Sequence, residues 1–289
     1  DDPRLYPFDA DGDGVDDGCG WQQVRGGAAH TCALDSSGGI ECWGSDSYDQ
    51  VSHAPPDSRY TAVSGGWYHN CALDSSGGIE CWGRDDYDQV SETPTGSGYT
   101  AVSGGGHHNC ALDSSGSIEC WGGDDQGVVS DAPTGSGYTA VSAGGEHNCA
   151  LDSTGSIECW GSDSDDQVSD APTSSGYTAV SEGNGFHTCA LDSSGSIECW
   201  GGDDHGEVSD TPAGSGYTAV SAGGYHTCAL DSLGINHCWG NNECDQITDA
   251  PTGTGYTAVG AGYWHTCTLA SGYTYCWGCD DSGSVSNAP

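Results

Sequence analysis

Residues 138–161 read YTAVSAGGEHNCALDSTGSIECWG, and close copies of this stretch recur along the chain. The first cysteines of successive copies are 39 residues apart, with a single step of 40. There are seven of them: Cys32, Cys71, Cys110, Cys149, Cys189, Cys228 and Cys267. A repeat of this length is typical of a solenoid or a propeller, in which each unit buries its faces only against its neighbours.

Each copy contains the pattern of a short β-hairpin. In the first copy, residues 32–35 and 40–43 read as two strands joined by a type I turn with a glycine bulge, which places Cys32 opposite Cys42. This pair falls on a non-hydrogen-bonded site, where cross-strand side chains come closest, so we expect a disulfide. The last copy has a turn one residue shorter, and a two-residue Ser-Gly turn still pairs Cys267 with Cys276.

The same count assigns one disulfide to every copy. The predicted pairs are Cys32–Cys42, Cys71–Cys81, Cys110–Cys120, Cys149–Cys159, Cys189–Cys199, Cys228–Cys238 and Cys267–Cys276. Each closes a loop of about ten residues, worth roughly 2 to 3 kcal/mol in the chain-entropy model. Paired zinc thiolates are the alternative, but they need four convergent ligands and short CxxC spacings, which the chain lacks.

Two further strands are expected in each copy. Residues 60–63 and their counterparts alternate apolar and polar side chains, and residues 50–52 and their counterparts form a short outer strand that stops at a proline such as Pro55. We therefore predict an all-β seven-bladed β-propeller with four-stranded blades and one disulfide within each blade, spanning residues 21–289 after an N-terminal arm, residues 1–20. The Trp of each Cys-Trp-Gly and the Leu/Ile pair of each hairpin would fill the space between neighbouring sheets.

The repeat motifs resemble those of a known family. The stretches 222–231 (AGGYHTCALD), 40–44 (IECWG) and 49–51 (DQV) recur from about Trp21 to Pro289. In these motifs the chain resembles the regulator of chromosome condensation (RCC1-like) repeat propellers, and among them most closely the bacterial propeller inhibitors of β-lactamase. The resemblance implies a propeller fold. It leaves function open, because the family includes exchange factors, inhibitors, lectin-like modules and structural repeats.

Composition predicts a secreted protein that works outside the cell or at its surface. The chain has 17 cysteines in 289 residues, which suits an oxidising compartment, and no apolar run long enough for membrane insertion. It begins at Asp1 rather than Met, so we expect that a signal peptide has been removed. A net charge of −39 with no lysine disfavours nucleic acid as a partner. Such self-repulsion is tolerable at high salt, at low pH or with abundant divalent cations.

The N-terminal arm carries a pattern of oxygen ligands. Residues 9–17 place carboxylates at loop positions 1, 3, 5 and 9, with a glycine at position 6 and a backbone carbonyl at position 7. The predicted Ca²⁺ ligands are Asp9, Asp11, Asp13, the carbonyl of Val15, and Asp17. The loop resembles a thrombospondin type 3 calcium loop. Position 12 is Gly20 rather than an acid, and the alternative is a solvated acidic tail.

A histidine precedes the first cysteine of every hairpin by two positions. These are His30, His69, His108, His147, His187, His226 and His265. Because blade symmetry would hold equivalent residues too far apart to bind one ion, we interpret them as structural imidazoles that bond backbone between adjacent blades. No catalytic Ser/His/Asp or Cys/His set stands out from the repeats, so we predict that the protein is not an enzyme.

The position before each histidine varies and is often aromatic. The candidate binding face consists of Trp67, Tyr68, His107, Phe186, Tyr225, Tyr263 and Trp264, all on equivalent inter-strand turns. Aromatic side chains gathered on one face of a ring are what a protein or glycan recognition surface uses. Capping of the blade ends is the alternative role.

Two functional hypotheses follow. The first is a structural subunit of an extracellular assembly or filament, a homo-oligomer or polymer joined through its calcium-binding arm; the near-identity of the blades favours it. The second is a secreted monomer that binds a protein or glycan. Cys19, Cys244 and Cys279 remain after the hairpin pairs, and we expect either a ring-closing Cys19–Cys279 bond, with Cys244 free or intersubunit, or an intermolecular bond.

Overall fold

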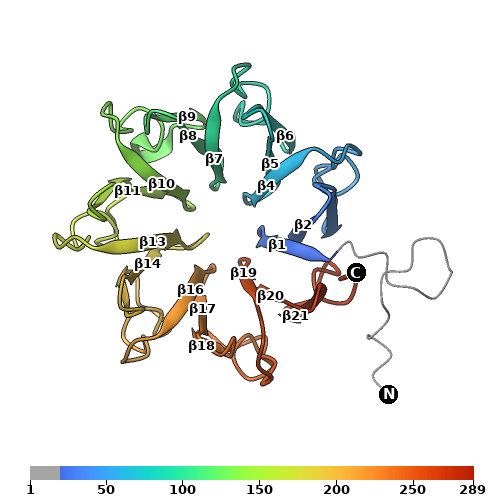
Figure 1. Ribbon diagram of the computed structural model, residues 1–289, viewed down its shortest axis with the longest axis vertical. Helices are drawn as coiled ribbons and strands as arrows, with labels where there is room; N and C mark the ends of the chain where they lie inside the picture. The colour runs from blue at the N-terminus through green and yellow to red at the C-terminus, as the bar shows by residue number, and fades with distance from the viewer. Residues whose placement is uncertain (1–19) are drawn as a thin grey trace, which may run out of the picture.

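The computed structural model describes residues 20–289, which form seven antiparallel β-sheets arranged as the blades of a ring (Figure 1). Each sheet has three strands in the order of the sequence, running outward from the centre. Within these residues no helix is long and apolar enough to cross a membrane. The all-β, seven-bladed prediction is therefore confirmed.

The three strands of each blade recur with nearly constant bounds. The inner strands are β1 (Trp21–Gly26), β4 (Tyr60–Gly65), β7 (Tyr99–Gly104), β10 (Tyr138–Ala143), β13 (Tyr177–Glu182), β16 (Tyr217–Ala222) and β19 (Ala258–Ala261). The middle strands are β2 (His30–Asp35), β5 (His69–Asp74), β8 (His108–Asp113), β11 (His147–Asp152), β14 (His187–Asp192), β17 (His226–Asp231) and β20 (His265–Ala270). The outer strands are β3 (Ile40–Gly44), β6 (Ile79–Gly83), β9 (Ile118–Gly122), β12 (Ile157–Gly161), β15 (Ile197–Gly201), β18 (Asn236–Gly240) and β21 (Tyr273–Gly278), and one short 3-10 helix, η1, spans Asp125–Gly127.

The hairpin register follows from the turn. Gly38 adopts φ +86°, and the backbone N–H of Gly38 donates to the Asp35 carbonyl, while the Asp35 N–H donates to Gly39. This geometry sets Cys32 opposite Cys42 with 4.1 Å between their Cα atoms. All seven hairpin disulfides are present, including Cys267–Cys276 across the shorter turn.

The predicted fourth strand is wrong. Residues 50–52 form a turn, because the Asp46 carboxylate accepts the backbone N–H groups of Val51 and Ser52, both at 2.9 Å. The buried Gln50 side chain accepts the Tyr48 N–H at 2.7 Å. With its donors satisfied locally, the segment closes on itself and does not extend the sheet.

Apolar side chains fill the space between neighbouring blades, as expected. Leu112 of β8 lies in one cluster with Val141, Ala150 and Trp160 of the next blade. The same arrangement joins the two ends of the chain, where Trp43 of the first blade packs with Leu269 of the last. Each sheet therefore buries its faces only against its neighbours.

A buried side-chain hydrogen bond links every blade to the next. His30 Nε2 donates to Asn70 Oδ1 at 2.8 Å, and the series ends with His265 bonded to Thr31 at 2.7 Å. The other pairs are His69–Asn109, His108–Asn148, His147–Thr188, His187–Thr227 and His226–Thr266, at 2.6 to 2.8 Å. The interpretation of these histidines as links between blades is correct, but the partner is a side chain rather than backbone.

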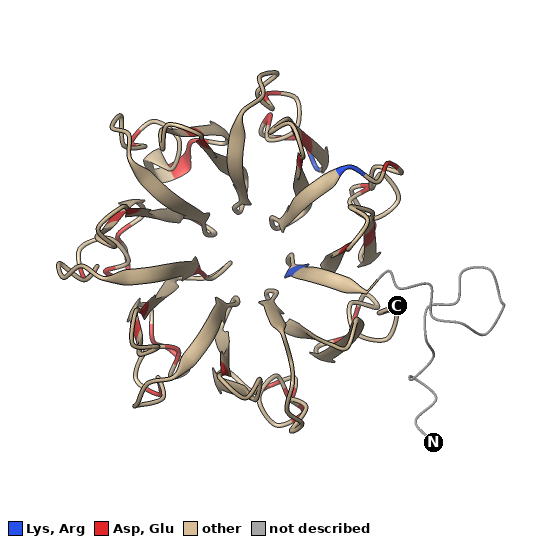
Figure 2. Ribbon diagram, viewed as in Figure 1, with Lys and Arg blue, Asp and Glu red and all other residues tan. Residues whose placement is uncertain are grey.

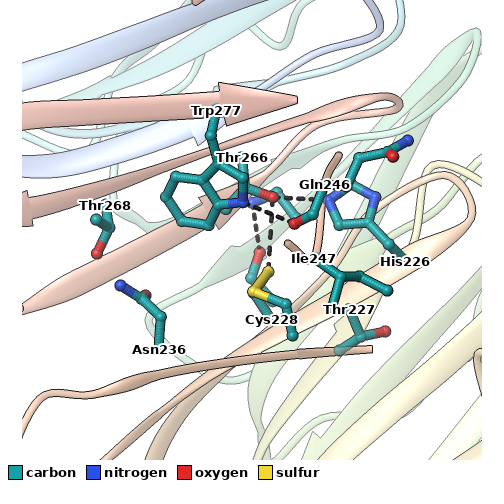
Figure 3. Close-up of a disulfide and its surroundings, with 12 residues drawn as sticks. His226, Thr227, Cys228, Asn236, Gln246, Ile247, Thr266, Thr268 and Trp277 are labelled. Atoms are coloured by element: carbon teal, nitrogen blue, oxygen red, sulfur yellow. Dashed lines mark hydrogen bonds between the residues drawn. A yellow bond between two sulfur atoms is a disulfide. The ribbon is translucent and has the colours of Figure 1, made fainter. Parts of the chain in front are cut away.

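A second set of bonds follows the same path. The indole N–H of Trp277 donates to the Gln246 carbonyl of the preceding blade at 2.7 Å, beside the Cys228 disulfide and the His226–Thr266 bond (Figure 3). The Trp43 indole donates to the Ser284 carbonyl at 3.0 Å, which again joins the last blade to the first.

The leftover cysteines pair differently from the prediction. Cys244 forms a disulfide with Cys279, joining the outer loops of the last two blades. The expected Cys19–Cys279 bond is therefore wrong, and Cys244 is neither free nor intersubunit. Cys244 and Cys279 follow the Trp-Gly pairs of adjacent blades at different offsets, and only the three-dimensional stacking of the loops brings them together. Cys19 lies outside the described residues.

We predict that non-reducing peptide mapping recovers a Cys244–Cys279 linked peptide. Loss of this bond in a C244A/C279A variant should lower the free energy of unfolding by roughly 3 to 4 kcal/mol, because the bond closes a loop of 35 residues. Chemical denaturation under non-reducing conditions measures the change. Recovery of a peptide containing Cys19 and Cys279 would contradict the pairing.

We also predict that acid destabilises the ring through its histidines. Burial lowers the pKa of all seven from 6.5 to about 3 or 4. The unfolded chain binds these protons near pH 6.5, so stability present above that pH is lost as the pH falls toward 4. Proton uptake on unfolding, measured between pH 4 and 6.5, should fall by about one in H147Q and about two in H147Q/H226Q. An unchanged uptake would show that these imidazoles do not titrate on unfolding.

Candidate binding face

Aromatic side chains from six of the seven blades form a connected cluster on one face of the ring. They lie on the turns between inner and middle strands and on the loops that follow the Trp-Gly pairs. We call this cluster the aromatic face: Tyr48, Trp67, Tyr68, Arg84, Tyr87, His107, His205, Tyr225, Tyr263 and Trp264.

One part of the face is built around an arginine. The guanidinium of Arg84 lies 5.0, 5.6 and 5.4 Å from the ring centroids of Tyr48, Tyr68 and Tyr87. Its Nε donates to Asp86 at 2.8 Å, a bond that raises the pKa of Arg84. A cation held over three rings is favourable by cation–π attraction and restricts all four side chains.

The aromatic contacts of this part continue toward the axis of the propeller. His107 stacks on Tyr87 with ring centroids 4.4 Å apart, and it meets the edge of Trp67 at 4.9 Å. Desolvation and then the charge of Arg84 lower the pKa of His107, so its imidazole is neutral at pH 7. A neutral ring stacks as an aromatic surface.

The second part lies on the fifth, sixth and seventh blades. Tyr225 and Tyr263 meet edge to face at 5.4 Å, and the Tyr263 hydroxyl donates to the Tyr225 hydroxyl at 3.3 Å. Trp264 packs on Tyr225 at 5.0 Å, and His205 meets the same tyrosine at 5.5 Å. Trp67 connects the two parts, since its ring lies 6.5 Å from Tyr263.

Most of the predicted face residues meet in the structure. Phe186 does not join the cluster. It packs against Gly202, where an added Cβ would lie 3.0 Å from the Phe186 Cβ. Sequence reasoning missed Tyr48, Arg84, Tyr87 and His205, because the loops after the Trp-Gly pairs read as acidic surface. In the structure, Tyr48 and Tyr87 stand out as large side chains that are 40% and 38% exposed.

Carboxylates surround the tyrosines of the first part. Asp46 and its counterpart Asp85 are loop caps that accept two backbone N–H groups each, and these bonds oppose desolvation to lower the pKa of both. Acidic residues gather along the outer loops of every blade (Figure 2). In residues 20–289 no group of three or more His, Cys, Asp or Glu side chains is placed to hold a metal ion. The predicted calcium ligands lie in residues 1–19, outside the described part of the chain.

Three comparisons relate this chain to known proteins. The model of the regulator of chromosome condensation (RCC1) repeat matches residues 60–89, 138–167 and 217–246. A search of curated protein sequences found no significant match.

Solved structures of similar fold include two plant receptor ectodomains. The complete ectodomain of the Physcomitrella patens receptor kinase CR4 superposes with a TM-score of 0.74 at 26% identity, covering 90% of this chain and 74% of that one. The CRINKLY WD40 ectodomain of the Arabidopsis thaliana receptor kinase ACR4 gives 0.73 at 26% identity, covering 92% and 98%. Saccharomyces cerevisiae Prp20p, described with its binding to Gsp1p and histones, gives 0.71 at 18% identity over 90% and 83%, a likeness of fold alone.

Proposed function

We propose that this chain, an RCC1-like repeat propeller, is an extracellular, non-enzymatic binding protein that recognises a protein ligand through the aromatic face. On such a scaffold, function resides in particular surface residues rather than in the fold. The observation that carries this proposal is the packing of Arg84 among Tyr48, Tyr68 and Tyr87. Aromatic and arginine side chains dominate the binding energy of protein interfaces. Here they are held in place before any ligand arrives, which reduces the entropy lost on binding.

The net charge of the chain indicates which kind of ligand it attracts. Arg84 is the one cation within the aromatic face, and Asp46, Asp85 and Asp86 flank it in a chain of net charge −39. Such a surface attracts basic partners and repels acidic ones. We therefore propose a protein segment that presents lysine or arginine beside an apolar anchor.

An extracellular location is supported by two observations. Eight disulfides lie within the described residues, and such bonds persist in oxidising compartments. The two most similar folds reported above belong to receptor ectodomains.

A peptide display library selected against the immobilised propeller tests the proposal. Enriched peptides should carry basic residues with an aromatic or aliphatic anchor, and their affinity should fall at least about tenfold in a Y48A/Y87A variant, because truncating two exposed rings removes the contact surface. The matched control is Leu233→Ala. Leu233 is 66% exposed but lies in the hairpin turn between β17 and β18, away from the face, so affinity should not change.

A glycan array forms the second arm of this experiment. Peptides that bind the wild type and the Y48A/Y87A variant equally would reject the aromatic face as the binding site. Saturable glycan binding that the same variant abolishes, with no enriched peptide, would reject the protein ligand and retain the face.

Calcium binding by the N-terminal arm, and assembly through that arm, remain predictions. Residues 9–17 carry the ligand pattern, and a filament would need this arm to dock on a neighbouring subunit.

We predict that the full chain binds one Ca²⁺ through the arm. Titration calorimetry should detect it, and D11N/D13N should abolish it, because the amide side chains that replace the two carboxylates remove the negative charge that attracts Ca²⁺. The matched control is D163N/D166N in an outer loop. If assembly depends on the arm, sedimentation velocity should show Ca²⁺-dependent oligomers in the wild type and none in D11N/D13N. Binding that survives D11N/D13N would place the ion elsewhere.

A further inference from the structure

The departures from the repeat converge on one place, the centre of the ring. Arg25 occupies a position that holds serine in five blades and glycine in the last. Glu182 occupies a position that is otherwise glycine or alanine. The only 40-residue step of the repeat adds a residue to the turn that follows Glu182. Because the blades are otherwise nearly identical, these three changes at one location indicate a site with a role of its own.

Inner strands from all seven blades line a central cavity of about 540 Å³. Its walls are mostly alanine, valine and serine, and among residues 20–289 only Arg25 and Glu182 line it with charged groups. They lie on β1 and β13, which face each other across the ring (Figure 2). The cavity therefore has a guanidinium on one side and a carboxyl group on the opposite side, in otherwise uncharged walls.

Arg25 has no carboxylate partner among the described residues. Arg59 and Arg84 both form ion pairs, with Glu80 and Asp86 at 2.7 and 2.8 Å. Arg25 donates only to the Val24 carbonyl, at 3.0 Å, although the chain carries 43 acidic residues. Its side chain is exposed to the cavity and surrounded by protein, and this desolvation lowers its pKa. An unpaired guanidinium in such a place has N–H donors that match the geometry of a carboxylate.

Glu182 is buried, whereas Arg25 is exposed to the cavity. Glu182 is 6% exposed, and within the described part of the chain neither carboxylate oxygen has a hydrogen-bond partner of normal geometry. Burial raises its pKa to about 8, and the nearby Ser142 hydroxyl opposes the shift only in part. A buried carboxyl group without a donor is unfavourable unless a ligand supplies one.

Trp67 crosses from its own blade to the turn that follows Glu182. Its indole N–H donates to the Asn184 carbonyl at 3.0 Å, so the ring reaches from the second blade to the fifth. It passes Gly106 and Gly145, where an added Cβ would lie 3.3 and 3.0 Å from indole atoms. Asn184 belongs to the lengthened turn, so the extra residue and the glycines together seat this indole.

We propose that the central cavity binds a small amino acid, with the ligand carboxylate on Arg25 and the ligand ammonium on Glu182. The walls provide no large apolar pocket, so the ligand is short and polar rather than aromatic. This site is separate from the protein-binding role of the aromatic face, and either can fail without the other.

Selective ¹⁵N labelling of arginine tests the site directly. The chain has four arginines and no lysine, so the spectrum contains four Nε–H signals, and R25S assigns the one of interest. The probes are glycine, β-alanine, 4-aminobutyrate and 6-aminohexanoate, with acetate and methylammonium as single-group controls. At millimolar concentration one ω-amino acid should shift the Arg25 signal saturably, at least about tenfold more tightly than acetate, while the Arg59 and Arg84 signals stay in place.

Consensus substitutions serve as variants, because each places in one blade the residue that other blades already carry. R25S should abolish binding, E182A should reduce it to the level of acetate, and R59G, which changes an arginine outside both sites to the glycine of other blades, should leave it unchanged. Binding at pH 7 should release protons, since the ligand ammonium favours ionised Glu182; calorimetry in two buffers of different ionisation enthalpy measures this. Absence of any saturable Arg25 shift, or equal affinity in R25S, would overturn the proposal.

Discussion

The hydrogen bond from each blade's buried histidine to the asparagine or threonine of the next blade is the interaction on which the rest of the structure depends. A three-stranded sheet cannot bury its own faces, so it is stable only between two neighbours. The bond fixes how adjacent sheets meet, and the Trp indole bond to the preceding blade fixes the same junction from its outer side. His265–Thr31 and Trp43–Ser284 repeat both contacts between the last and first blades. No junction is therefore left with an unpaired face.

This redundancy allows the turns to vary. Hairpin disulfides and inter-blade bonds lie below the turns at the end of the ring, so changes in those turns do not disturb the fold. Small residues such as Gly106 and Gly145 leave space that Trp67 occupies, and tyrosines from neighbouring loops gather around Arg84. The aromatic face and the two charged residues of the central cavity arise from such departures from the repeat, on a scaffold that the repeat itself stabilises.

How much could be predicted from the sequence depends on how local each contact is. The Cys32–Cys42 pairing follows from four turn residues, and the seven blades follow from the repeat. Residues 50–52 were misassigned because a short polar stretch ending at a proline suits a strand or a turn, and only the Asp46 side chain decides between them. The Cys244–Cys279 bond and the contact of Trp67 with Asn184 join different blades, so neither has a local signal. Arg25 and Glu182 differ visibly from the repeat, but their shared cavity appears only once the ring is built.

Matched substitutions at an internal junction and at the junction of the chain ends test the central claim most directly. The Thr227 hydroxyl is hydrogen-bonded to His187 at 2.8 Å at an internal junction, and Thr31 forms the equivalent bond with His265 at 2.7 Å between the last and first blades. Thr227→Val and Thr31→Val keep the shape and remove the hydroxyl, so each should cost about 1 to 3 kcal/mol in chemical denaturation, in a single transition. A Thr31→Val variant as stable as the wild type, beside a destabilised Thr227→Val variant, would show that the first and last blades are not joined.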